Sequence, residues 1–404
     1  MNQPLKGVRI LDLSMWWSGP MCTSYLGALG AEIIKLESVQ SPDGFRFTLS
    51  TPRENWWEFG PQFNSANHNK RGATLNLLDD EGKAYFKKVL EKCDIVIENY
   101  TPRVMENFQL TYDVLTQYKK DIIMLSMPAY GKTGPYRDQP GFAYTFEMLS
   151  GIAQLNGYQD GKPMTVLGVA DVLAGFHAAA ALLIALEHRD QTGEGQEIEL
   201  AQNEGCVNYM GAPIADYILN GENWGRVGNR QPGIAPQGVY RAQGKDSWVA
   251  ISITSDEEWH SLCQVINEPA LLNDERFKTV EGRIAAHDEI DVIISQWTQQ
   301  DSHHAIASRL QKVGVPAGPV LEVHEMEHDP FLKNMYQEVT RDYVGTHLYP
   351  SWPIKWNNER VLHKAPAPLL GQDNEYVFKE LLQLSDDEYT SLLEKNIIGD
   401  KMLR

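Results

Sequence analysis

The sequence lacks the features that define several large classes of protein. Its four cysteines, Cys22, Cys93, Cys206 and Cys263, are scattered and form no CxxC pair, which indicates reduced thiols and neither a disulfide framework nor a zinc site. No uninterrupted apolar run reaches the ~18 residues of a membrane span, and the longest, 178–186, is too short. The N-terminal residues lack the basic-then-apolar order of a signal peptide. We therefore expect a cytoplasmic protein with no membrane segment and no bound metal.

Basic residues are also in short supply. Lys and Arg number 36 against 54 Asp and Glu, and the resulting net charge of −18 argues against non-specific nucleic-acid binding. An anionic small ligand stays open, because a few local cations can dominate a pocket. The 404 residues, 42% of them apolar, are enough for two domains with a sizeable core.

A dinucleotide fingerprint is missing as well. No GxGxxG follows the first predicted strand, and Gly27 and Gly30 fall late in the first predicted helix, where helix packing and a C-cap explain them. The sequence therefore gives no reason to expect an NAD-type site.

What the first half does contain is an alternation of short apolar runs and helical patterns. We predict strands at 8–13, 32–36, 73–77, 94–97 and 122–127, with helices at 20–29, 80–93 and around Val104. Such alternation predicts an α/β fold in which helices cover a parallel sheet. Ligands bind beyond the carboxyl ends of such strands, which here carry residues 14–19, 98–102 and 126–134.

A second, smaller unit follows a linker. Residues 226–237 are rich in Gly, Pro, Asn and Gln, and beyond them we predict strands at 238–241 and 248–253 and helices at 257–266, 284–299 and 303–313. We predict a large α/β domain over 1–225, a small α+β domain over 226–335 and a return segment, 336–404, that completes the large domain. The last part, 372–393, reads as largely helical.

Asp171 is the most informative single residue. It lies at the mouth of an apolar helix predicted to run from Ala174 to Glu187, where free N–H groups favour negative charge. A carboxylate with a pKa near ~4 is more than ~99% ionised at pH 7 and can attack an activated acyl group without a His or Lys to deprotonate it. From this stretch alone an ordinary N-cap aspartate is the simpler interpretation. His177, on the same helix, is expected to be a packed core histidine.

Several motifs, weak one by one, are specific in their order and spacing. They lie at 5–12, 18–20, 29–37, 67–71, 94–102, 130–136, 192–196, 274–277 and 314–320. Together they resemble, nearly end to end, the family III CoA-transferases of the formyl-CoA/carnitine type. In this alignment Asp171 falls on the catalytic aspartate of that family.

The resemblance implies a mechanism and a set of partners. The aspartate attacks an acyl-CoA thioester to give a mixed anhydride, the CoA thiolate returns to give an aspartyl-CoA thioester, and the acceptor acid repeats the sequence in reverse. The chemistry needs no permanently bound cofactor, since CoA enters as a thioester with a free carboxylic acid as the second substrate. Family members are interlocked, ring-like homodimers with a Rossmann-like large domain, so the resemblance makes the domain predicted over 1–225 Rossmann-like and CoA-binding. A heteromer with a related subunit stays open for this chain.

The residues expected to bind CoA are Trp17, Ser18, Lys70, Arg71, Leu75, Asn99, Tyr100 and Lys132. The pair Lys70 and Arg71, between a polar loop and a strand, suits phosphate groups, with a solvated basic pair as the alternative. Lys132 is, from its surroundings alone, an ordinary surface charge. The segment from Gly228 to Gly238 is the nearest analogue of the glycine-rich loop that covers the aspartate in some family members.

The chain departs from the family pattern at two places. α-Methylacyl-CoA racemases of this fold carry a His-Asp pair where this chain has Phe142 and Ala143, so a racemase, which stays open, lacks an obvious second base. The indoles of Trp16 and Trp17 stand where formyl-CoA-type members place a glutamine, which predicts a bulky, partly apolar or aromatic acceptor of the benzylsuccinate type. Trp56-Trp57 is equally well explained as core. A non-catalytic partner subunit is the third alternative, and the presence of Asp171 weighs against it.

Overall fold

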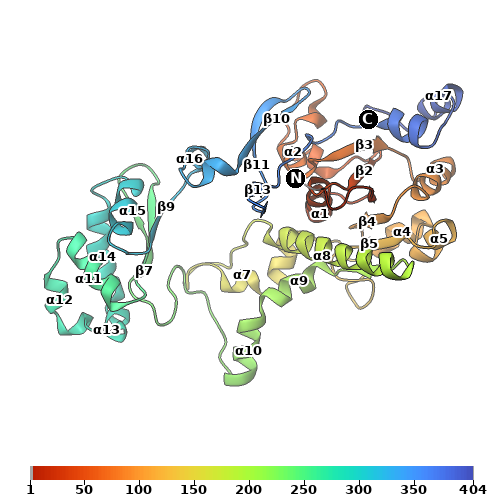
Figure 1. Cartoon of the computed structure of the whole chain (residues 1–404). Coiled ribbons are helices and arrows are strands. Elements are labelled where there is room, and N and C mark those ends of the chain that lie inside the picture. The colour runs from red at the N-terminus through yellow and green to blue at the C-terminus, as the bar shows by residue number, and fades with distance from the viewer. Residues whose placement is uncertain (1–2, 404) are drawn as a thin grey trace. The chain divides into compact units, whose positions relative to one another are not determined.

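The computed structural model describes residues 3–403, which divide by their contacts into two compact units (Figure 1). Unit 1 takes in the chain up to Ala153, Thr165–Asn223 and the chain from Asn334 onward. Unit 2 consists of Gln154–Met164 and Trp224–Lys333. The short segment 154–164 thus joins unit 2, although it lies within the stretch that we assigned to the large domain from the sequence.

Unit 1 is built on a six-stranded sheet in the order β3-β2-β1-β4-β5-β6, with every neighbouring pair parallel. The strands are β1 (Arg9–Asp12), β2 (Glu32–Glu37), β3 (Lys70–Thr74), β4 (Ile95–Glu98), β5 (Ile123–Ser126) and β6 (Glu197–Glu199). The predicted α/β fold with a parallel sheet is confirmed. The strand order reverses between β1 and β4, and doubly wound sheets bind ligands beyond the carboxyl ends of the strands at such a switch point.

Helices cover both faces of this sheet, which explains why its central strands are apolar without alternation. Along β1, Ile10 packs with α1 and α8 on one face and Leu11 packs with α3, α4 and α5 on the other. In Figure 1 these two sets of helices lie on opposite sides of the strands. The helices of this part are α1 (Ser18–Ala28), α2 (Pro61–Ala66), α3 (Asp80–Leu90), α4 (Pro102–Phe108), α5 (Tyr112–Tyr118), α6 (Ala143–Leu149), α7 (Ile152–Leu155), α8 (Val169–Thr192), α9 (Gln202–Tyr209) and α10 (Gly211–Asn220), with short 3-10 turns η1 (Gly44–Arg46) and η2 (Trp56–Glu58).

Two element boundaries differ from the predicted ones in ways that matter for the site. Strand β3 begins at Lys70, not at Ala73, because Lys70 already pairs with Ile33 of β2. Helix α8 begins at Val169, five residues before the predicted start at Ala174, because the left-handed Gly168 (φ 96°) ends the preceding loop. Asp171 therefore lies inside the first turn of α8.

Helix α8 (24 residues) is the longest helix in the described part of the chain. By length and composition alone it could cross a membrane, with a mean hydropathy of 2.0 over its best window, of which 44% is buried. Its buried face, which includes Ala174, Ala178 and Leu182, packs with β4 and β5 in the core of unit 1. Core helices of globular proteins commonly meet the same criteria, so we read α8 as such a helix.

The chain after Asn334 returns to unit 1. It forms the hairpin β10 (Tyr336–Arg341) and β11 (Gly345–Pro350), the short pair β12 (Lys355–Trp356) and β13 (Glu359–Arg360), the π-helical turn η5 (Tyr376–Leu381) and α17 (Asp386–Glu394). Val377, Phe378 and Leu392 of this segment join the core on the α3 face of the sheet. The region 372–393 is therefore helical in two pieces, with a break between them.

Unit 2 is an α+β unit around an antiparallel sheet in the order β7-β8-β9. Its strands are β7 (Gln237–Arg241), β8 (Trp248–Ser252) and β9 (Ala317–Val320), and its helices are α11 (Asp256–Val265), α12 (Ala270–Asn273), α13 (Val280–Ala285), α14 (His287–Thr298), α15 (His303–Gln311) and α16 (Val323–Met326), with the turn η3 (Glu275–Phe277). The turn η4 (Leu332–Met335) follows at the edge of the unit. Val249, Trp259 and Ile294 lie in its separate hydrophobic core.

Candidate active site

Asp171 is the third residue of α8, and it does not cap its own helix. The capping position belongs to Gly168, and the residue before it, Leu167, is also left-handed (φ 53°), which is costly for a branched side chain. The ordinary N-cap interpretation of Asp171 is therefore wrong. Its carboxylate is left available to neighbours on other elements.

The first of these neighbours is Ser18, at the start of α1. Its backbone N–H and its hydroxyl lie close enough to the Asp171 carboxylate to favour the ionised form of that group through hydrogen bonding. The two helices can approach this closely because α8 carries Gly175, where a Cβ atom would lie 2.9 Å from the Ser18 carbonyl oxygen. Asp171 thus lies at the N-terminal ends of two helices, and both favour negative charge there.

The pKa of Asp171 is nevertheless raised to about 6, chiefly by burial and further by the charge of Glu147, while the Ser18 bonds act in the opposite direction. A carboxyl with this pKa is about nine-tenths ionised at pH 7. This corrects the expectation of more than ~99% ionisation, which assumed a solvated aspartate. The group stays predominantly anionic, and it is a stronger base than an ordinary aspartate.

Glu147 is a site residue that the sequence did not reveal. It lies on α6 with no solvent exposure, and its two carboxylate oxygens accept the backbone N–H groups of Val166 (2.5 Å) and Gly168 (3.0 Å). It thus holds the loop that leads into Asp171. The one signal in the sequence was a lone acid in the apolar stretch Phe146-Glu147-Met148-Leu149.

Trp16 and Trp17 form an aromatic wall beside this loop. The Trp17 ring lies against Gly168, where a Cβ atom would come within 2.7 Å of the indole. Trp16, itself left-handed (φ 65°), meets Phe45 and Phe142 edge-on, with ring centroids 5.7 and 5.3 Å apart. The strained positions at Trp16 and Leu167 mark the two chain segments that meet at Asp171, and such strain is concentrated at functional sites.

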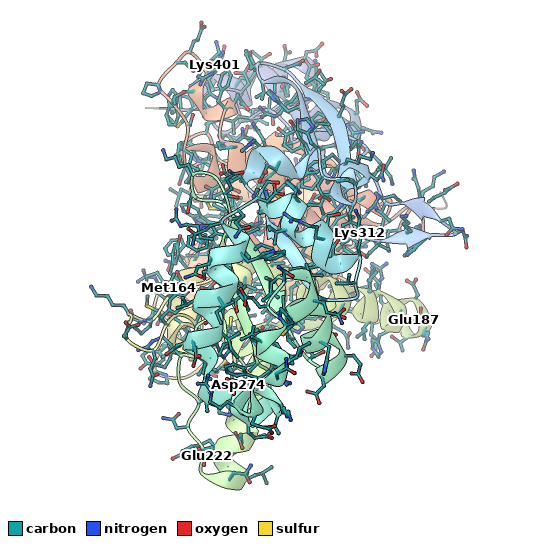
Figure 2. All side chains as sticks on the ribbon, turned by 90° about the vertical axis from the view of Figure 1, so that its left-hand side faces the viewer. Met164, Glu187, Glu222, Asp274, Lys312 and Lys401 are labelled. Atoms are coloured by element: carbon teal, nitrogen blue, oxygen red, sulfur yellow. The ribbon has the colours of Figure 1, made fainter. Side chains whose placement is uncertain are left out.

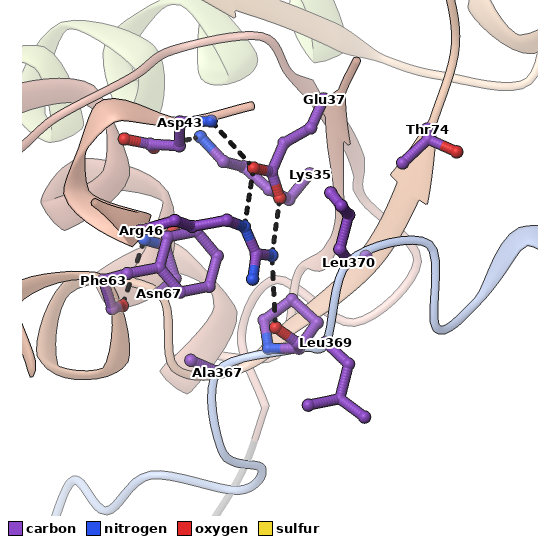
Figure 3. Close-up of polar contacts among 12 residues, drawn as sticks. Lys35, Glu37, Asp43, Arg46, Phe63, Asn67, Thr74, Ala367, Leu369 and Leu370 are labelled. Carbon is purple, nitrogen blue, oxygen red and sulfur yellow. Dashed lines mark hydrogen bonds and ion pairs between the residues drawn. The ribbon is translucent and has the colours of Figure 1, made fainter. Parts of the chain in front are cut away.

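A buried network of ion pairs holds the loop between β1 and α1 in this conformation (Figure 3). The Asp43 carboxylate accepts a hydrogen bond from the backbone N–H of Trp16 (3.0 Å) and forms an ion pair with Lys35 (2.9 Å). The Lys35 ammonium also donates to the Ser14 carbonyl. The Asp43 N–H in turn donates to Glu37 (3.0 Å), which pairs with Arg46 (2.8 Å). The position of Trp16 therefore depends on charges that are closed off from water.

A cavity of about 270 Å³ opens at the carboxyl ends of β1 to β4. Each strand contributes a residue that follows it: Leu13, Ser38, Leu75 and Tyr100. Leu75 and Tyr100, both predicted CoA contacts, thus lie on one ligand-sized surface. Larger cavities exist in both units, but this one lies at the switch point of the sheet.

Asn99 lies between this cavity and Asp171. Its side-chain amide makes two bonds with the backbone of Met15 (2.8 and 2.7 Å), and Met15 lines the cavity. The same amide reaches the Ser18 hydroxyl at 3.4 Å. Four predicted CoA contacts, Ser18, Leu75, Asn99 and Tyr100, are therefore brought together, and Trp17 adjoins them through α1. The Tyr100 hydroxyl itself is committed to the Leu13 carbonyl (2.7 Å).

Lys70 and Arg71 are not brought to this site. Because β3 begins at Lys70, the backbone of the pair lies at the amino end of its strand, although the Lys70 side chain reaches Asp12 at the carboxyl end of β1. The Lys70 ammonium is buried and forms an ion pair with Asp12 (2.9 Å). Burial lowers the pKa of this ammonium to about 8. Arg71 pairs with Glu32 and Asp373. The predicted start of this strand was three residues too late, and the assignment of Lys70 and Arg71 to CoA phosphates stays a prediction.

Other predicted residues fall elsewhere. Lys132 follows β5 and pairs with Glu197 of β6, so its role with CoA stays a prediction. The side chain of His177 is exposed and not packed in the core as expected, because it faces outward from α8. In η2 the ring of Trp56 packs against the rings of Trp57 and Phe47. Among the ring contacts of the described residues, none joins this pair to Asp171.

Two features of unit 2 belong to no site that we can connect with Asp171. Gly228 and Gly233, in the predicted covering loop, are left-handed, and the loop lines a cavity of about 540 Å³ on the β7-β8-β9 sheet. That this loop covers the aspartate stays a prediction.

A histidine cluster in the same unit is also separate from Asp171. His303 and His304 both reach the same oxygen of Glu325, at 3.0 and 3.3 Å, so the Glu325 carboxylate already has hydrogen-bond partners.

Comparison with known proteins agrees with this geometry. The family described as CoA-transferase family III matches residues 5–374. The succinyl-CoA–D-citramalate CoA-transferase of Chloroflexus aurantiacus is 32% identical over 98% of either chain. The beta subunit of the succinyl-CoA–L-malate CoA-transferase of the same organism is 30% identical, also over 98% of each chain. The chain therefore belongs to CoA-transferase family III, as its motifs predicted, and is a CoA-transferase.

A solved structure supports the fold assignment. A CaiB/BaiF family protein from Brucella suis superposes with a TM-score of 0.85 over 94% of this chain and all of that one, at 26% identity. The parallel sheet and the small second unit are thus shared with a known architecture.

Proposed function

We propose that this enzyme transfers CoA from an acyl-CoA such as succinyl-CoA to a free carboxylic acid, with Asp171 as the group that is acylated. One Asp171 oxygen attacks the thioester carbonyl, a C–O bond forms, the C–S bond breaks, and CoA leaves as a thiolate. The thiolate then attacks the aspartyl carbonyl of the anhydride, which releases the donor acid and leaves an aspartyl-CoA thioester. The acceptor carboxylate attacks that thioester, and the returning thiolate takes the new acyl group and frees Asp171.

The observation that carries this proposal is the setting of Asp171. Its carboxylate is not used to cap α8, it faces the Ser18 N–H and hydroxyl at the start of α1, and burial makes it more basic than an ordinary aspartate. The Ser18 N–H also offers hydrogen bonding to an oxyanion that develops beside it. Acylation neutralises a partly buried charge, so the site favours the acylated form over the free carboxylate.

The CoA portion fits the cavity at the carboxyl ends of β1 to β4. Leu75 and Tyr100 supply apolar and aromatic surface there, and Ser38 supplies a hydroxyl. Asn99 and Met15 connect the cavity to Ser18, so a chain that leaves the cavity past Asn99 reaches Asp171. We infer that the nucleotide end occupies the cavity and that the thioester end meets the aspartate.

The acceptor that fits best is a succinate with an apolar substituent. The relatives named above act on D-citramalate and L-malate, both of which are substituted succinates. In this chain Trp16 packs edge-on against Phe142, whose side chain is 52% exposed, and we propose that these two rings face the acceptor acid. An apolar substituent, of which the benzyl group is the bulkiest we predict, can pack on that surface.

The test is a comparison of acceptors with succinyl-CoA as the donor. We expect kcat/KM to be higher for methyl-, phenyl- or benzylsuccinate than for formate, oxalate or acetate, and Phe142→Ala to reduce it roughly tenfold for the aryl acids but little for the small ones. Tyr144→Ala, equally exposed on α6, is the matched control. We choose Phe142 over Trp17 because the Trp17 ring supports Gly168 and its loss would disturb Asp171 itself. A preference for formate or oxalate that Phe142→Ala leaves unchanged would overturn the acceptor assignment.

We also infer that the chain works as an oligomer. Every residue of α10 has at least partial exposure, and Ile218 and Leu219 are 73% and 78% exposed. Helix α8 adds Ile184, at 71%, on its outer face. Figure 2 labels Glu187 and Glu222, which lie near the ends of these two helices. Apolar faces of this kind are typical of subunit contacts, and a second copy of this chain is the partner we propose. A monomer in analytical ultracentrifugation at micromolar concentration would contradict this.

A further inference from the structure

We propose that Glu147 is a positioning residue for the transfer reaction: it fixes the left-handed turn that presents Asp171, and its negative charge drives the aspartate toward its acylated, neutral form. The inference rests on the proposed role of Asp171. It goes beyond that role because it explains how a carboxylate, an ordinarily weak nucleophile, is made reactive without a neighbouring base.

The geometric half of the proposal rests on two hydrogen bonds. Both Glu147 oxygens are used, one by the Val166 N–H (2.5 Å) and the other by the Gly168 N–H (3.0 Å). These two residues flank Leu167, whose left-handed φ of 53° costs free energy and must be held by its surroundings. A carboxylate suits this position because it accepts at both oxygens, whereas a glutamine would place an N–H₂ group against one of the two donors.

The electrostatic half rests on burial. Glu147 is completely buried, and no ion pair to it is among those of the described residues. Its charge acts on Asp171 and also on the buried thiol of Cys206 in α9. Two like charges in a medium of low dielectric repel each other strongly.

Acylation relieves this repulsion. When an Asp171 oxygen bonds to the donor carbonyl and the C–S bond breaks, the negative charge moves from the carboxylate to the departing CoA sulfur. Glu147 therefore destabilises the free enzyme relative to the anhydride and the aspartyl thioester, in which Asp171 carries no charge. The same repulsion makes the ionised carboxylate more basic and hence a better nucleophile.

The pKa of Asp171 depends on the charged and polar groups that surround it. Helix α6 offers Glu147, α9 offers the Cys206 thiol, whose pKa burial raises to about 11, and α1 offers the uncharged N–H and hydroxyl of Ser18. Attack requires ionised Asp171, so kcat/KM should fall as pH drops through about 6. Removing the Glu147 charge lowers the pKa of Asp171, so this acid limb must move to lower pH.

The experiment compares Glu147→Gln and Glu147→Asp with the wild-type enzyme. For Glu147→Gln we expect kcat to fall roughly ten- to a hundredfold with KM for the acyl-CoA nearly unchanged, and the acid limb of kcat/KM to move down by about half a pH unit or more. Glu147→Asp keeps the charge but shortens the reach, so we expect a similar loss of kcat with the acid limb close to its wild-type position. Glu388→Gln, which alters a carboxylate that accepts the Ser385 N–H in α17, is the control and should change neither.

The outcomes separate this proposal from the role of Asp171. An acid limb that stays in place in Glu147→Gln, or a kcat within twofold of wild type, overturns the proposal for Glu147. If Glu147→Gln does not fold, Glu147→Asp decides: a wild-type kcat in that variant contradicts the positioning role. If Asp171→Asn keeps wild-type activity, the role of Asp171 fails first, and that result does not depend on any Glu147 variant.

Discussion

Asp171→Ala is expected to lower kcat for CoA transfer by roughly four to six orders of magnitude, because it removes the group that carries the acyl moiety between donor and acceptor. Binding of acyl-CoA should persist, since the cavity that we assign to CoA is formed by other residues, Leu13, Ser38, Leu75 and Tyr100. Steady-state transfer from succinyl-CoA, paired with calorimetric titration of CoA, measures the two quantities separately. Transfer within tenfold of wild type would contradict the mechanism.

Asp171→Asn provides the control for folding. The pKa of Asp171 lies at about 6 in the folded protein against 3.8 for the unperturbed group, so ionisation weakens folding as pH rises from about 4 to about 6, and the penalty is constant above that. Asparagine carries no such penalty. We expect Asp171→Asn to raise the free energy of unfolding at pH 7 by roughly 1–3 kcal/mol and to lose this advantage near pH 4. A loss of activity with a gain of stability cannot come from misfolding.

Arg46→Met is expected to cost about 3–5 kcal/mol of unfolding free energy, because it strips the partner from buried carboxylates. The Arg46 guanidinium pairs with Glu37 (2.8 Å) and Glu58 (2.9 Å) and lies 3.7 Å from the centre of the Phe63 ring (Figure 3). Without it, Glu37 loses its ion-pair partner in a buried part of the core, whereas Glu58 loses one of two and keeps Arg341. Urea denaturation followed by fluorescence and circular dichroism measures the change.

Arg53→Met is the matched control for Arg46→Met. Arg53 lies on the surface with its guanidinium 4.0 Å from the Phe59 ring, and surface substitutions of this kind usually change stability by about 0.5 kcal/mol or less. We also expect Arg46→Met to lower activity, since Arg46 supports Glu37, Glu37 supports Asp43, and Asp43 holds the Trp16 N–H. A loss of less than about 1 kcal/mol would show that the network relaxes or takes up water.

Much of the fold follows from local pattern. The central strands are short apolar runs because both their faces are buried, as Ile10 and Leu11 are in β1, and this is visible in the sequence. The boundary of β3 was missed because its first residues, Lys70 and Arg71, are charged, and their burial depends on Asp12, Glu32 and Asp373. Pairing of that kind across 58 or 302 positions of the chain has no local signature.

Asp171 was identified from the sequence as the candidate catalytic residue, but only some of the residues around it were. Ser18, Leu75, Asn99 and Tyr100 each follow a strand or begin a helix, so the topology of the sheet brings them together. Glu147 lies 24 residues before Asp171 on a different helix, and its role arises from contacts with the backbone, which depend on loop conformation and not on residue type. For the same reason the pKa of Asp171 could not be judged from its position at a helix start.

The central claim, that Asp171 is the acyl-carrying residue, is tested most directly by mass spectrometry of the enzyme incubated with succinyl-CoA in the absence of an acceptor acid. The account predicts a peptide containing Asp171 that is heavier by the mass of CoA less one water, that hydroxylamine converts to the hydroxamate, and that is absent from Asp171→Asn. Turnover without any adduct on this peptide, or an adduct on Cys206 or Glu147 in its place, would contradict it.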